Sequence, residues 1–171
     1  MSCRMVVAVV AGASLVLFGA SGGVAHAQPR GAGCMLQGVF KTIPTLKSDA
    51  EKIRYTITGK ATDCHWSDGG SESGTFIASG HGVASCSYGT SQGVAHIRWN
   101  DRKTSTMTFT TTNVFDGVEL EGTFVKGESK GYDAHALLVF VVDKNEPVGC
   151  ITEFGLHDAT FYGFCERGRL D

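Results

Sequence analysis

Five cysteines follow residue 27, and their thiols could form disulfides, bind a metal or act as nucleophiles. They are Cys34, Cys64, Cys86, Cys150 and Cys165. No two of them have the C-x-x-C spacing typical of zinc sites, so the pattern favours disulfides over a metal cluster. An odd number predicts two disulfides and one remaining thiol.

The sequence leaves the pairing of these cysteines open, although one arrangement is favoured. Cys64 and Cys86 enclose turn residues and a single expected strand, which makes them the favoured local pair. Cys34 with Cys150 would then join the first strand to the long connection near the end of the chain. Cys165 competes for either partner, because spacing alone does not determine connectivity.

The histidines offer little further chemistry. After residue 27 they are His65, His81, His96, His135 and His157. None of them forms an i, i+2 or i, i+4 pair typical of a metal site, although His81 and His96 could approach one another across a hairpin. His157 with Cys165 could form a nucleophile–base pair, but a spare cysteine on the last strand is the favoured interpretation. We predict no catalytic residue, no metal site and no cofactor.

The loop that follows Cys64 is the best candidate for a recognition surface. It places His65, Trp66 and Asp68 close together beside an expected disulfide. An exposed tryptophan could stack on a sugar or insert into a protein partner. The alternative is that Trp66 covers the end of the domain as a plug, as large aromatic side chains are usually substantially buried.

Residues 1–27 have the pattern of a cleavable signal peptide. Arg4 is the only charge among them, residues 5–18 form an apolar run, and residues 25–27 supply the A-x-A motif of a cleavage site. We expect cleavage after Ala27 and no other segment able to span a bilayer. The product would be a soluble protein of the cell envelope or the extracellular space, where thiols tend to pair.

The remaining chain, residues 28–171, has no strong charge. It contains 14 basic and 17 acidic residues, a formal net charge of −3. This balance argues against nucleic acid as a partner and against electrostatic attraction to a membrane surface.

Alternation of apolar and polar residues predicts a single all-β domain over residues 28–171. In the clearest run, Met107 and Phe109 alternate with a series of threonines. Short connections favour an antiparallel meander, closed as an up-and-down barrel or folded as a two-layer sandwich. The eight expected strands cover residues 35–40, 52–61, 74–85, 94–99, 104–112, 118–125, 132–143 and 156–164.

One strand differs from the others because it is apolar on both faces. Residues 136–142 have the sequence ALLVFVV. Such a strand is either covered on both sides or lies at a contact with a partner, which makes self-association through residues 136–142 an alternative function.

Short motifs occur in order along most of the chain, and they resemble those of a group of small exported β proteins from actinomycetes with no established activity. They are Cys64, Gly74-Thr75, Ser85-Cys86, Ile97-Arg98-Trp99-Asn100-Asp101, Thr104-Ser105-Thr106, Glu121-Gly122-Thr123, Cys150, Gly155-Leu156 and Ala159-Thr160-Phe161. The resemblance implies a secreted bacterial β domain in which Cys64 would pair with Cys86, and it supplies no catalytic residue. A weaker likeness to avidin-type barrels covers residues 94–125, but their aromatic ligand-binding set is not evident, so biotin binding is not carried over.

We therefore expect a secreted, non-enzymatic binding or interaction domain whose partner is a protein or a glycan. Two alternatives from other classes stay open. One is a secreted hydrolase whose site is assembled from distant residues. The other is a structural protein of the cell envelope that self-associates.

Overall fold

A computed structural model describes residues 32–67, 69–114, 117–141 and 156–169, which form one antiparallel sheet. Its strands are β1 (Gly33–Leu46), β2 (Glu51–His65), β3 (Gly74–Ala84), β4 (Gly89–Trp99), β5 (Thr104–Val114), β6 (Gly117–Gly127), β7 (Tyr132–Val141) and β8 (Leu156–Arg169). All eight strands predicted from the sequence are present.

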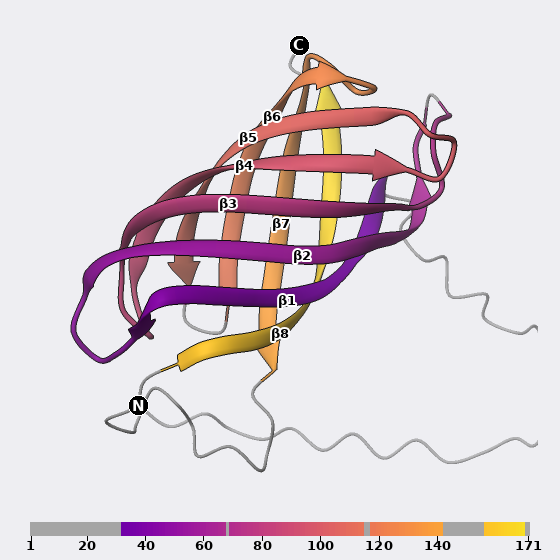
Figure 1. Ribbon diagram of the computed structural model, residues 1–171. Helices are drawn as coiled ribbons and strands as arrows, with labels where there is room; N and C mark the ends of the chain where they lie inside the picture. Colours follow the sequence, from indigo (N-terminus) through magenta and orange to yellow (C-terminus); the bar gives the residue numbers. More distant parts are fainter. Residues whose placement is uncertain (1–31, 68, 115–116, 142–155, 170–171) are drawn as a thin grey trace, which may run out of the picture.

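The sheet closes into an up-and-down barrel, which decides between the two architectures that the sequence allowed. Each strand pairs with the next one along the chain, and β8 pairs with β1. In Figure 1, β2, β3 and β4 run across the front of the barrel, while β7 and β8 cross behind them at a steep angle. Among the described residues, no helix is long and apolar enough to cross a membrane.

The alternation in the sequence places one side of every strand inside the barrel. Ile57 on β2, Ile97 on β4 and Phe109 on β5 are all buried in one hydrophobic core. Phe161 on β8 is only 1% exposed, and its ring lies 6.5 Å from that of Phe76 between centroids. The interior is therefore filled by side chains from all around the barrel, as expected for eight strands.

Two glycines make room for the buried phenol of Tyr55. Tyr55 points inward from β2, and a Cβ atom at Gly80 would lie 2.3 Å from its hydroxyl oxygen. A Cβ atom at Gly93 would lie 2.9 Å from the same oxygen. Any side chain at either position would displace Tyr55, so these glycines are required by close approach.

The threonines of β5 that alternate with Met107 and Phe109 face outward, as the sequence predicted, whereas Thr111 lies on the inner side. Thr104, Thr108, Thr110 and Thr112 are exposed, whereas Met107 between them is buried. The turn between β4 and β5 covers residues 100–103, as the bounds of the two predicted strands implied, and the backbone N–H of Lys103 donates to Asp101 Oδ1 over 3.1 Å.

The disulfide between Cys34 and Cys64 corrects the favoured pairing. Their Cα atoms lie 4.0 Å apart, at adjacent ends of β1 and β2. The predicted Cys64–Cys86 bond is wrong because β3, 11 residues long, lies between the two cysteines. Such a strand spans about 35 Å, whereas a disulfide needs Cα atoms within about 7 Å.

The other cysteines are arranged as follows. Cys34 is bonded to Cys64, so the predicted Cys34–Cys150 bond is also wrong. Cys86 is disulfide-bonded, and Cys150 lies outside the described residues. Cys165 is a free cysteine, which agrees with the expected leftover thiol.

Candidate functional site

The predicted recognition loop closes one end of the barrel with its tryptophan. Trp66 is half-buried, and its ring meets that of Trp99 edge-on with centroids 6.5 Å apart. Its Nε1 donates to the carbonyl oxygen of Ser71 over 3.1 Å, and the guanidinium of Arg167 lies 4.2 Å from its ring centroid. Trp66 is therefore held from three sides, which agrees with the plug interpretation.

The other two residues predicted for this loop contribute less. His65 is exposed at the end of β2, and Asp68 lies outside the described residues. A binding role for His65, Trp66 and Asp68 stays a prediction.

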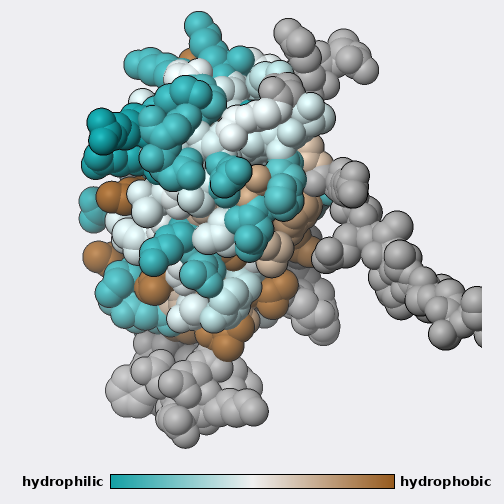
Figure 2. Space-filling view, turned by 90° about the vertical axis from the view of Figure 1, so that its right-hand side faces the viewer, coloured by the Kyte–Doolittle hydropathy of each residue, from teal (hydrophilic) through white to brown (hydrophobic). Residues whose placement is uncertain are grey.

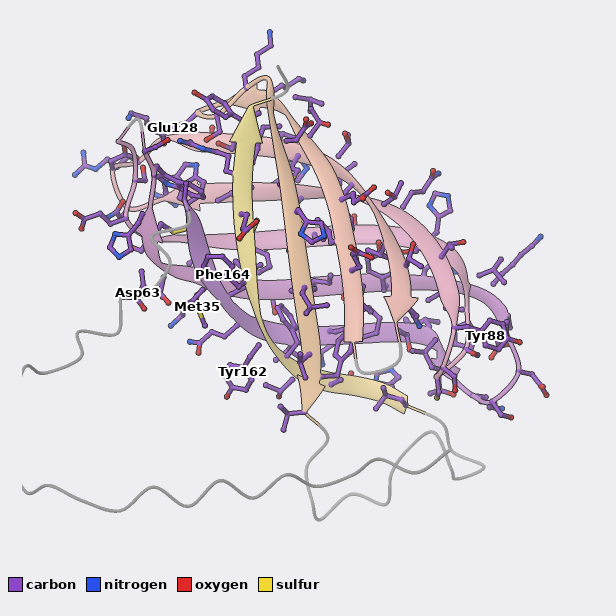
Figure 3. All side chains as sticks on the ribbon, turned by 180° about the vertical axis from the view of Figure 1, so that it is seen from behind. Met35, Asp63, Tyr88, Glu128, Tyr162 and Phe164 are labelled. Carbon is purple, nitrogen blue, oxygen red and sulfur yellow. A yellow bond between two sulfur atoms is a disulfide. The ribbon has the colours of Figure 1, made fainter. Side chains whose placement is uncertain are left out.

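A polar network continues from the plug across the same end of the barrel. Glu128, labelled in Figure 3, accepts hydrogen bonds from Ser71 Oγ and Lys103 Nζ, both over 3.0 Å. Lys103 also lies 2.8 Å from Asp101 Oδ2, and this contact lowers the pKa of the Asp101 carboxyl. The hydrogen bonds that Lys103 Nζ donates to the carboxylates of Asp101 and Glu128 raise the pKa of Lys103. These contacts join the segments that contain Ser71, Lys103 and Glu128 at the end of the barrel that Trp66 covers.

The interior also contains hydroxyl groups that satisfy one another. Ser91 Oγ donates to the Tyr55 hydroxyl over 3.0 Å and lies 2.6 Å from Thr111 Oγ1. Burial raises the pKa of the Tyr55 phenol, and the bond from Ser91 opposes that rise in part. These three side chains stabilise a polar layer inside the barrel, because buried polar groups without partners are costly.

The space left in the apolar part of the interior is small. A cavity of about 70 Å³ is lined by Leu36, Phe124, Leu138 and Cys165, among other apolar side chains. Binding sites for small organic molecules usually measure about 300–1,000 Å³. The cavity is therefore a packing gap rather than a site for a ligand of that size.

Cys165 points into this space and is poorly suited to nucleophilic chemistry. It lies opposite Cys34 on β1 and Ala136 on β7. Burial, with a smaller contribution from the charge of Glu166, raises the pKa of its thiol to about 12. An activated cysteine has a lowered pKa, so this environment has the opposite effect.

The histidines are not brought together. His81 on β3 lies opposite Gln92 on β4, whereas His96 on β4 lies opposite Ile77 on β3. The two histidines are therefore four residues out of register. His157 and Cys165 lie eight residues apart along β8, about 26 Å in an extended strand. Within the described ranges, no three His, Cys, Asp or Glu side chains gather closely enough to hold a metal ion.

The most distinctive surface of the barrel is apolar and lies on the outside of β7, β8 and β1. We call it the outer apolar face. It comprises Met35 and Val39 on β1, Leu137, Val139 and Val141 on β7, and Tyr162 and Phe164 on β8, each between 37% and 51% exposed. Figure 3 shows Met35, Tyr162 and Phe164 close together on the rear of the molecule, far from Tyr88 at the opposite end.

Strand register makes this face continuous. Phe164 lies between Met35 on one side and Leu137 on the other. In the next row, Tyr162 lies beside Val139. A contiguous exposed apolar patch of this kind is typical of an interaction site. By contrast, hydrophilic residues gather over the upper part of the view in Figure 2.

The sequence identified three of the seven residues of this face. The outward residues of β7 lie within the apolar segment 136–142, which predicted a second covered face. The contributions of β1 and β8 were missed, although the outward position of Tyr162 and Phe164 on alternate residues was a signal. Their neighbours across the sheet could not be known without the closure of β8 on β1.

Comparison with known proteins identified no relative of this chain. A search of protein-family models found no match, and searches of curated proteins and of solved structures found none either. The candidate site therefore depends on its own geometry.

Proposed function

We propose that this chain is an exported, non-enzymatic binding domain that acts in the cell envelope or the surrounding medium, and that its partner is a protein. Export is supported by the cysteines. The Cys34–Cys64 disulfide and the disulfide-bonded Cys86 are usual in oxidising compartments and rare in the cytosol.

The observation that carries the proposal is the outer apolar face. Its seven side chains come from three neighbouring strands and form one surface, whereas singly scattered apolar residues need no explanation. The face contains two aromatic side chains, Tyr162 and Phe164, and aromatic residues are enriched where proteins bind one another.

A protein partner is favoured over a glycan by the positions of the aromatic rings. Sugar stacking needs an accessible aromatic plate, and Trp66, the candidate for that role, is packed against Trp99 and covered by Arg167. The outer apolar face consists mainly of aliphatic side chains, which suit the dry contact between two proteins.

Binding is favoured over hydrolysis by the chemistry of the interior. The hydroxyl groups of Tyr55, Ser91 and Thr111 are hydrogen-bonded to one another. The thiol of Cys165 has a raised pKa. Neither group is prepared to attack a substrate.

A capture experiment tests the proposed function. The purified protein is immobilised and exposed to an envelope extract from cells that produce it, beside the variants Val139→Lys and Val94→Lys. Val139 lies in the outer apolar face, while Val94 is a similarly exposed valine on β4, on the other side of the barrel.

We expect one stoichiometric protein to bind the wild-type chain and the Val94→Lys variant but not the Val139→Lys variant. Equal capture by all three, or no captured protein, would contradict the proposed role of this face. Export is tested separately by the mass of the protein recovered outside the cytoplasm, which should begin at Gln28. A protein kept inside the cell with residues 1–27 attached would contradict export.

A further inference from the structure

The outer apolar face raises the question of which protein covers it, and the barrel itself excludes one route. Each strand is paired on both sides because β8 closes on β1. A partner therefore cannot add a strand to an open edge of the described sheet, and it must pack against a face.

The size of the face suits a pair of small barrels. The exposed parts of its seven side chains total on the order of 600 Å². A stable interface of standard size buries about 800 Å² on each partner, of which the core is apolar and the rim polar. The face supplies most of such a core, and the flanking strands would supply the rim.

Charges on the two flanking strands have opposite sign. On one side of the face, Lys60 points outward from β2, in register with Gln37 on β1. On the other side, Glu119 and Glu121 lie on β6, and Glu119 is in register with Leu137. Lys60 and Glu119 each lie two strands from β8, in opposite directions around the barrel.

This arrangement is complementary to itself. A twofold axis running along β8 would place the β2 flank of one copy against the β6 flank of the other, while the two β8 strands meet in the centre. Lys60 belongs to the row of Tyr162, and Glu119 to the row of Phe164. Adjacent rows on the same side of a strand lie about 7 Å apart, which the long lysine and glutamate side chains can span.

We propose that the outer apolar face binds a second copy of this chain, and that the protein is a twofold dimer in which β8 packs against β8 and Lys60 faces Glu119 of the other copy. This inference rests on the proposed function, since it names the partner of the same face. The apolar centre provides the affinity, and the opposite charges at the rim determine the orientation.

Sedimentation velocity of the purified protein over a range of concentrations tests the dimer. We expect a monomer–dimer equilibrium with a dissociation constant raised at least about tenfold by Val139→Lys, which corresponds to about 1.4 kcal/mol. The control Val94→Lys should leave the constant unchanged. A wild-type protein that stays monomeric, or equal effects of the two variants, would overturn the proposal.

Charge exchange tests the orientation. Lys60→Glu and Glu119→Lys should each weaken the dimer, because each places like charges at both rims. In the protein that carries both substitutions, the charges of the two flanking strands are exchanged, so it should regain most of the lost affinity. A double variant weaker than either single variant would overturn the proposed axis. Circular dichroism of each variant establishes that the barrel remains folded.

The outcomes separate this inference from the proposed function. If the wild-type chain is monomeric but captures a different protein through a surface that Val139→Lys disrupts, the proposed function holds and the dimer does not. If the chain is monomeric and Val139→Lys changes nothing, both fail.

Discussion

Phe161 offers a direct test of the packing inside the barrel. Its side chain is 1% exposed, and its ring lies 6.3 Å from Phe140 and 6.5 Å from Phe76 between centroids. These neighbours belong to separate, hydrogen-bonded strands, so they cannot readily move into the space that a smaller residue would leave. Phe161→Ala should therefore lower the free energy of unfolding by about 3–5 kcal/mol.

Ile77→Ala is the matched control, because Ile77 is a large apolar residue that is 63% exposed on β3. Its substitution should lower the free energy of unfolding by less than about 1 kcal/mol. Urea denaturation followed by tryptophan fluorescence measures both, at one dilute protein concentration so that association does not contribute.

Similar losses for the two variants would refute the inward orientation of β8. If Phe161→Ala does not fold, Phe161→Leu provides the measurement, since it removes less volume and should destabilise by about 1–2 kcal/mol. A loss for Phe161→Leu no larger than that for Ile77→Ala would equally contradict the packing described here.

Three further predictions concern covalent and ionisable groups. Peptide mapping without reduction should recover Cys34 joined to Cys64, and replacing both by alanine should cost about 3–4 kcal/mol in the chain-entropy model, measured by urea denaturation. The thiol of Cys165 should be alkylated at least about a hundredfold more slowly at pH 8 in the folded than in the unfolded protein, because its pKa of about 12 leaves little thiolate. Mass spectrometry measures both alkylation rates, and equal rates would contradict the burial of Cys165. Because burial raises the pKa of Tyr55 above 10.0, its favourable contribution is complete below that pH and is lost as the pH rises above it. Unfolding titrations should show Tyr55→Phe, but not Tyr88→Phe, reducing this alkaline loss of stability.

The sequence predicted those features of the fold that depend on neighbours along the chain. Tyr55 and Ile57 alternate with polar residues on β2, and the structure places both inside. The start of β4 at Gly89 was missed, because Gly89 to Gly93 has small and polar residues without an apolar alternation. Local pattern reports a half-buried strand only where side chains differ between the two faces.

The features that depend on distant neighbours could not be obtained in this way. The Cys34–Cys64 disulfide and the full extent of the outer apolar face both follow from register between paired strands. The favoured Cys64–Cys86 bond was chosen for closeness in sequence, but a hairpin strand carries its two ends to opposite ends of the barrel. The burial of Trp66 required its contacts with Trp99 and Arg167, from two distant strands.

Closure of the barrel by β1 and β8 has a consequence for biosynthesis. β1 is synthesised first, yet one of its two partners is the last strand of the chain. Until β8 emerges, a partly made sheet would keep β1 with an unpaired edge, the arrangement most prone to aggregate. A polypeptide that crosses a membrane before it folds avoids this interval, because all eight strands then become available together and the sheet can close in one cooperative step.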